Sequence, residues 1–121
     1  MSAQVGTSSP VVDWDAGARR RRQLEAELGR IVAALPRLGV QRAIVFGSAA
    51  RGDVRGQSDL DLILIADSRE PFSERCARFY GELEPAVGLD LLVYTPQEFE
   101  ELRARPFLAR ALAGSRIVYE A

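Results

Sequence analysis

The run Leu60–Ala66, LDLILIA, is the feature that most restricts how this chain can fold. It is almost continuously apolar and rich in branched side chains, which is typical of a strand buried in the core of a domain. A shorter apolar run, Ala43–Phe46, precedes it, and the residues between the two runs, GSAARGDVRGQSD, are mostly small or charged. We therefore predict two core strands, separated by a loop that contains a short helical turn over residues 47–52.

The rest of the chain alternates between helical and extended patterns. Apolar residues at helical spacing, with proline or capping residues at the ends, predict four longer helices. These helices begin at Ala16, Pro71, Thr95 and Pro106. Two further strands are predicted at 88–94 and 116–120, so the order of elements predicts an α/β (α+β) fold, with helices packed on a small mixed sheet of about four strands. Residues 1–15 are predicted to form an N-terminal tail and 16–121 a single domain.

Positions within these elements give three further interpretations. The apolar stripe of the second helix comprises Phe72, Cys76, Phe79, Tyr80 and Leu83. Because Cys76 lies on this stripe, it is interpreted as a core residue rather than a reactive thiol. The arginines at 19–22 open the first helix and are interpreted as a solvated face, with contact to RNA or to a partner as the alternative. In the tail, Val11, Val12 and Trp14 are candidates for an anchor.

Composition excludes several classes of function. The chain has 121 residues, a net charge of -1, no histidine and a single cysteine. Histidine-based catalysis and histidine metal sites are therefore excluded, and no intramolecular disulfide can form, which fits a reducing cytosol. The charge gives no general attraction to nucleic acid or to an anionic membrane. Without a long apolar run or a signal peptide, a cytoplasmic protein is expected.

Two carboxylates lie at the start of the core strand, where a purely structural role would favour apolar residues. Asp59 and Asp61 are two residues apart, so on a strand their side chains share a face and repel each other. Asp90 repeats the pattern near the start of the next predicted strand. A hard divalent cation such as Mg²⁺ removes the repulsion, because it prefers carboxylate oxygens. If the two strands are neighbours, three carboxylates converge, which is enough for two metal ions and phosphoryl transfer.

The loop before these carboxylates has the composition of a phosphate-binding loop. Gly47 and Ser48 stand where a strand turns into a helical segment, and unpaired backbone N–H groups at such a turn favour phosphate. Glycine allows close approach and the serine hydroxyl adds a donor, while Arg51 and Arg55 can neutralise phosphate charge. Each feature has a structural alternative, such as a simple turn or a surface aspartate on an edge strand. Their joint occurrence favours a functional site.

The residues Gly47-Ser48-x-x-x-Gly52, followed by Ser58-Asp59-x-Asp61, resemble the signature of the DNA polymerase β-like nucleotidyltransferases. The string GSAARG…SDLDL is most similar to the minimal nucleotidyltransferases of prokaryotes, and the motif resemblance covers residues 43–94. It implies the polymerase β-like nucleotidyltransferase fold. This sequence keeps every acidic position of the motif, so nothing in it indicates a degenerate copy.

The resemblance also implies roles for individual residues. Asp59, Asp61 and Asp90 are expected to be catalytic and to bind two Mg²⁺ ions. Asp90 is also the expected base. The expected nucleotide-binding residues are Gly47, Ser48, Arg51, Gly52 and Ser58. ATP is the expected substrate.

The same resemblance implies a partner. Stand-alone minimal nucleotidyltransferases pair with HEPN proteins, which are ribonuclease toxins, and in some systems neutralise them by transferring AMP from ATP to a tyrosine. We therefore expect an antitoxin that modifies a HEPN toxin, whose surface would form the acceptor site in place of an extra domain. The alternatives are an antitoxin that acts by binding alone, and a nucleotidyltransferase for a small molecule such as an antibiotic, with dimerisation completing the pocket. Direct action on nucleic acid is not expected.

Overall fold

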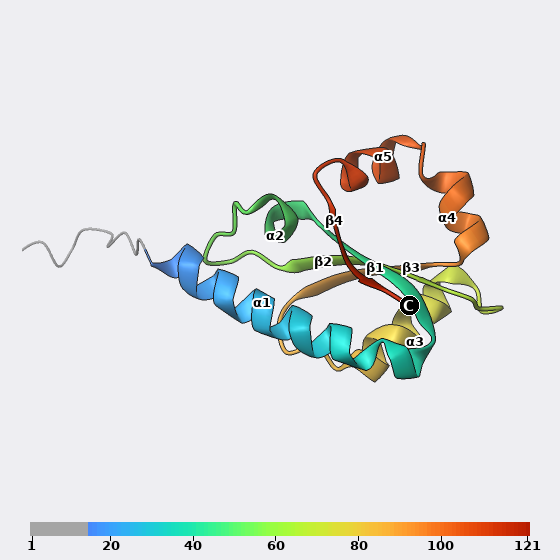
Figure 1. Cartoon of the computed structure of the whole chain (residues 1–121), viewed down its shortest axis with the longest axis horizontal. Helices are drawn as coiled ribbons and strands as arrows, with labels where there is room; N and C mark the ends of the chain where they lie inside the picture. The colour runs from blue at the N-terminus through green and yellow to red at the C-terminus, as the bar shows by residue number, and fades with distance from the viewer. Residues whose placement is uncertain (1–14) are drawn as a thin grey trace, which may run out of the picture.

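The computed structural model describes residues 15–121 (Figure 1), so the predicted anchor at Val11, Val12 and Trp14 lies outside the described residues. A single four-stranded sheet, in the order β3-β2-β1-β4, carries the helices. The strands are β1 (Val40–Phe46), β2 (Leu60–Ala66), β3 (Leu89–Tyr94) and β4 (Arg116–Glu120). The helices are α1 (Ala16–Ala34), α2 (Gly47–Arg51), α3 (Phe72–Leu83), α4 (Pro96–Leu102) and α5 (Pro106–Leu112), with a 3-10 turn at Pro36–Leu38. The predicted α/β class and four-stranded mixed sheet are confirmed.

The topology of the sheet brings the termini of three strands together at one end of the sheet. β1 runs antiparallel to both β2 and β4, whereas β2 and β3 are parallel and are joined through α3. The register pairs Phe46 with Asp61 and Asp61 with Asp90. The end of β1 therefore meets the beginnings of β2 and β3, and α2 follows directly from this point.

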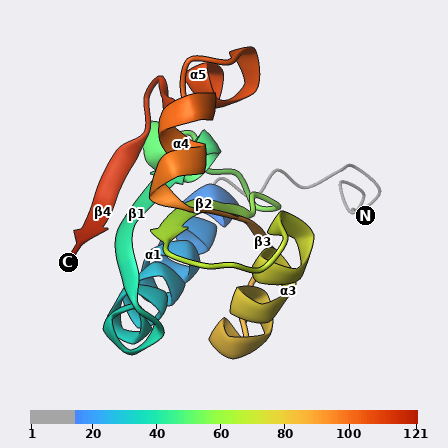
Figure 2. The same cartoon turned by 90° about the vertical axis from the view of Figure 1, so that its right-hand side faces the viewer.

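Helices cover both faces of the sheet (Figures 1 and 2). On one face, α1 and α3 pack against Leu62 and Leu64 of β2. On the other, α4 and α5 pack against Ile63 and Ile65 of the same strand. Because successive strand residues point to opposite faces, burial on both sides explains why β2 is apolar at nearly every position.

Most predicted boundaries hold, and the differences have local causes. β2 and β4 have the predicted bounds, whereas β1 begins at Val40, three residues before the predicted start. Gln41 and Arg42 interrupt the apolar run, yet their backbone groups pair in the sheet and in a bulge. Strand pairing therefore extends the strand beyond what side-chain hydrophobicity indicates.

The prediction for the apolar stripe of α3 is wrong at two positions. Phe72 and Tyr80 are 38% and 44% exposed, whereas Phe79 is buried and Arg75 is only 2% exposed. The helix turns the face of residues 75, 79 and 83 toward the core, so an arginine occupies a position where an apolar residue is expected. Cys76 packs against the core as predicted and accepts a hydrogen bond from a strand N–H group.

Most of the hydrogen-bond donors of the buried Arg75 side chain have acceptors. The Arg75 guanidinium donates to the carbonyl oxygens of Val93 and Glu70, at 2.9 and 2.7 Å, and to the Glu98 carboxylate at 2.6 Å. Glu98 also closes a capping box with Thr95 at the start of α4, which confirms the predicted helix start. Arg75 therefore ties α3 to the edge of β3 and to α4.

Candidate active site

Asp61 and Asp90 come together where β2 and β3 begin. They are register partners on neighbouring parallel strands, and their carboxyl groups lie close enough to interact directly. Burial, the Asp90 carboxyl group and the charge of Asp59 raise the pKa of Asp61 to about 6, while Arg51 acts in the opposite direction. The sheet therefore holds two carboxyl groups side by side, and this proximity makes the ionised form of Asp61 less favourable than it is in water.

Gly47 allows the Asp61 carboxylate to lie directly against the backbone where β1 turns into α2. Its φ angle is 70°, in the left-handed region that favours glycine. A Cβ atom at this position would overlap Asp61 Oδ2. Gly47 of the predicted loop and Asp61 of the predicted strand are thus in contact.

Asp59 lies just before β2 and has different neighbours. Its side chain is 56% exposed, and Oδ1 lies 3.6 Å from Arg20 Nη2. The carboxylate also rests against Gly88, where a Cβ atom would overlap it. Asp59 is close enough to affect the pKa of Asp61, but its carboxylate faces Gly88 and α1. The predicted convergence therefore holds for Asp61 and Asp90, and the three-carboxylate metal site stays a prediction.

The donor set fits a hard divalent cation in its chemistry. Within residues 15–121, no group of three or more acidic or cysteine side chains is gathered closely enough to hold a metal ion. However, the Asp61–Asp90 pair places like charges at one point, and Asp59 lies within electrostatic reach. A divalent cation between Asp61 and Asp90 would relieve this repulsion, with Asp59 as the adjacent third carboxylate.

The loop between β1 and β2 holds the remaining predicted residues. The Ser48 hydroxyl makes no hydrogen bond within the described part of the chain, so its donor is available to a ligand. Gly52 ends α2 with a left-handed φ of 82°. The Ser58 hydroxyl accepts a hydrogen bond from the Arg55 backbone N–H at 2.8 Å, so it closes a turn. Arg51 lies 3.5 Å from Asp53 and is largely exposed.

The arginine cluster of α1 was not among the predicted site residues. Arg20 Nε donates to the Ser58 carbonyl at 2.7 Å, and Arg21 donates to the Gly52 carbonyl at 2.6 Å. The interpretation of residues 19–22 as a solvated face is therefore wrong for Arg20, which is 19% exposed, whereas Arg21 is exposed and still contacts the loop. Sequence pattern could not reveal this contact, because the loop is distant in sequence and only the packing of α1 brings it close.

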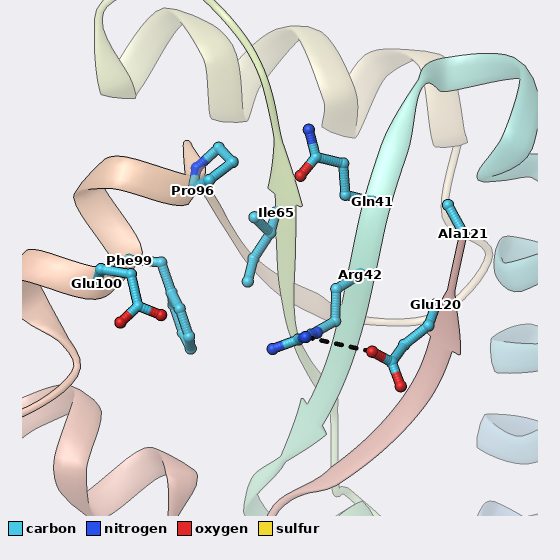
Figure 3. Close-up of a pocket in the computed structure, with 8 residues that line it drawn as sticks. All are labelled: Gln41, Arg42, Ile65, Pro96, Phe99, Glu100, Glu120 and Ala121. Carbon is cyan, nitrogen blue, oxygen red and sulfur yellow. Dashed lines mark ion pairs between the residues drawn. The ribbon is translucent and has the colours of Figure 1, made fainter.

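A pocket of about 300 Å³ lies at the opposite end of the sheet, between β4 and α4 (Figure 3). Arg42 and Glu120 form an ion pair of 3.2 Å in it, and Ile65 and Phe99 form apolar walls. Ile65 is at the far end of β2 from Asp61. We place the candidate active site at the carboxylates because chemically suitable groups converge there.

Comparison with known proteins identifies a family. Residues 26–119 match the family described as nucleotidyltransferase domain. The crystal structure of a candidate nucleotidyltransferase from Sulfolobus solfataricus shares the fold with a TM-score of 0.65, at 15% sequence identity, over 92% of this chain and 93% of its own. No curated protein matches this chain.

Two mutant structures of the MntA–HpeT toxin–antitoxin pair are more distant. Their TM-scores are 0.45 and 0.46, at 17% and 15% sequence identity, over 80% of this chain and 72% or 73% of theirs. This likeness is too slight to indicate a shared partner. In residues 15–121, every helix is too short or too polar to cross a membrane.

Proposed function

This chain belongs to the nucleotidyltransferase domain family, and on that premise we propose that it transfers AMP from ATP to a hydroxyl group. The pairing of Asp61 with Asp90, together with the contact of the Asp61 carboxylate with Gly47, is the observation that carries the proposal. In this reaction the acceptor oxygen bonds to the α-phosphorus, and the bond from that phosphorus to the β-phosphate oxygen breaks. Pyrophosphate leaves, and the acceptor's proton is taken up by a base.

The residues of the site divide this work among them. Mg²⁺ held by Asp61 and Asp90, with Asp59 as the third ligand, would stabilise the charge that develops on the phosphates. The Gly47 backbone and the Ser48 hydroxyl would bind the polyphosphate. Asp90 is exposed at the second residue of β3, so it can reach an incoming hydroxyl and accept its proton.

The proposed acceptor is a protein, namely a tyrosine of a HEPN-type toxin that this chain neutralises. The support is the sequence resemblance of GSAARG…SDLDL to the minimal nucleotidyltransferases. A largely exposed Asp59 and Asp90 are also compatible with a large acceptor that approaches from solvent. Toxin identity, tyrosine modification and Mg²⁺ all belong to this proposal.

The test is transfer of label from α-labelled ATP, with Mg²⁺, into the protein encoded beside this chain. We expect label in that protein, and we expect Asp61→Asn to reduce labelling at least about a hundredfold while the chain still folds. Asp67→Asn is the matched control, because Asp67 is exposed beyond the other end of β2 and bonds only Gln41 in the described residues.

The outcomes separate three functions. Full labelling by Asp61→Asn would refute the proposed site. A stable complex without labelling, with neutralisation retained when all three aspartates are changed to asparagine, would identify an antitoxin that acts by binding alone. Label on a small molecule instead of the protein would identify a small-molecule nucleotidyltransferase.

A further inference from the structure

The first turn of α1 packs against the loop that connects α2 to β2 and leads to the candidate site. Gly17 lies so close to the loop that a Cβ atom there would stand 2.7 Å from the Val54 carbonyl oxygen. One residue earlier, the Ala16 methyl lies against Gly56. These small residues let the helix backbone touch the loop that leads to Asp59. Figure 1 shows this end of α1 beside the loop that follows α2.

This contact fixes the Arg20 guanidinium in one orientation. Its Nε donates to the Ser58 carbonyl at 2.7 Å, and Nη1 donates to Gln23 Oε1 at 3.2 Å. Nη2 then lies 3.6 Å from Asp59 Oδ1. The Arg20 side chain is only 19% exposed, so it is held by packing as well as by these bonds. Arg20 is thus a cation aimed at Asp59.

A divalent cation at Asp59 would compete with this guanidinium. Both are positive, and Arg20 lies on the Oδ1 side of the carboxylate, so a metal ion that binds Asp59 through Oδ1 displaces the ion pair with Arg20. Arginine also binds phosphate oxygens through its planar fork of donors. The phosphates of a nucleotide bound beside Gly47 would therefore offer Arg20 an alternative partner.

We propose that Arg20 is a positioning residue that withholds Asp59 from the metal and releases it when nucleotide phosphates bind. Metal and nucleotide binding are then coupled, because each removes one partner of the Arg20–Asp59 ion pair. The inference rests on the proposed function, since it requires a metal and a nucleotide at this site. It adds a residue from α1 that the motif of the loop and strand does not contain.

The test measures Mn²⁺ affinity by the electron paramagnetic resonance signal of free Mn²⁺, on the full chain at about 0.15 M salt, where distant exposed charges are screened. Arg20→Met is expected to bind Mn²⁺ about two- to fivefold more tightly in the absence of nucleotide, the range of an exposed ion pair. Asp59→Asn should abolish this gain in the double variant. Arg22→Met is the matched control, because Arg22 is on the same helix and makes no hydrogen bond or ion pair within residues 15–121.

A second series repeats the measurement with saturating α,β-methylene-ATP, whose α–β bridge cannot be cleaved in the transfer, and subtracts the Mn²⁺ that the analogue binds by itself. The analogue should increase the Mn²⁺ affinity of the wild-type chain by a larger factor than that of Arg20→Met. Equal factors would overturn the proposed release of Asp59. Arg20→Lys keeps the positive charge but cannot contact the Ser58 carbonyl and Asp59 at the same time through a guanidinium. Its Mn²⁺ affinity should therefore lie between those of wild type and Arg20→Met.

The first series also separates this inference from the proposed function. Unchanged or weaker Mn²⁺ binding by a folded Arg20→Met chain would overturn the role of Arg20, even if the wild type transfers AMP. Tighter binding that disappears with Asp59→Asn would support that role, even if no acceptor is ever labelled. Failure of the wild type to transfer label counts against the proposed function alone.

Discussion

At the scale of the residue, the candidate site departs from what stability alone would select. Asp61 occupies a position in a strand whose other residues are apolar and buried. Burial and the neighbouring Asp90 carboxyl raise its pKa to about 6, so ionising Asp61 is less favourable in the folded chain than in the unfolded chain. A residue that opposes stability in this way is typical of a functional site.

Two glycines act through the carboxylates that they touch. A side chain at Gly47 would meet Asp61 and would also strain a left-handed backbone, whereas a side chain at Gly88 would meet Asp59 first, on a backbone that is not left-handed. Gly88 therefore offers the cleaner test, because the two effects are not combined there.

We predict that Gly88→Ala folds normally but loses activity. The added methyl group displaces a half-exposed carboxylate, so the free energy of unfolding should change by less than about 0.5 kcal/mol. Displacing Asp59 should lower nucleotidyl transfer about ten- to hundredfold. Transfer rates and urea unfolding check both parts. Gly81→Ala is the control, because a Cβ atom there meets nothing within 4 Å, and its activity should be unchanged. Equal activity of the two variants would contradict the role of Gly88.

At the scale of the element, α3 is fastened to the sheet by a charge rather than by apolar contacts alone. Arg75 donates to two backbone carbonyls, and the edge strand β3 thereby gains a partner that no neighbouring strand supplies. One nitrogen, Arg75 Nε, is buried and has no hydrogen-bond partner among the described residues, which offsets part of the gain.

We predict that Arg75→Met lowers the free energy of unfolding by about 2–4 kcal/mol. Methionine fills similar space, but the carbonyls of Val93 and Glu70 lose a buried donor. Arg78→Met is the control on the same helix, because its ion pairs with Glu70 and Glu82 are exposed and should contribute less than about 1 kcal/mol. Urea unfolding measures both, and similar losses would show that Arg75 has no special role.

At the scale of the whole molecule, two carboxylates join helices that are far apart in sequence. Glu27 of α1 accepts hydrogen bonds from Arg30 and from the Ala86 backbone N–H, at 2.7 and 2.5 Å, so it links α1 to the segment after α3. Its partner Arg30 donates to the carbonyl of Leu83, the last residue of α3, and to that of Glu84, which follows it. Glu98 links α4 to Arg75 in the same manner.

These links predict a loss of stability in acid. Hydrogen bonding to Arg30 lowers the pKa of Glu27, and hydrogen bonding to Arg75 lowers the pKa of Glu98, both below the ordinary value of 4.5. Their contribution is therefore complete above pH 4.5 and is lost as the pH falls through the lowered values. Urea unfolding between pH 3 and pH 6 measures this loss. Changing both residues to glutamine should flatten the profile, and an unchanged slope would contradict the prediction.

The sequence by itself determined the elements and the kind of chemistry. Apolar runs and spacing give β2 and β4 their bounds, and Thr95 with Glu98 gives the start of α4. Such signals are local, because hydrophobic period and capping act over a few residues. The aspartates are recognisable as candidate site residues because nothing local explains a carboxylate inside an apolar strand.

Only the tertiary structure decided which of these groups meet. The pairing of Asp61 with Asp90 depends on the parallel register of β2 and β3, which the crossover through α3 sets. The contact of Arg20 with Asp59 and the burial of Arg75 depend on how the helices pack. Charge alone gives no sign of either contact, because an arginine at a helix surface has the same local pattern whether it faces solvent or a distant loop.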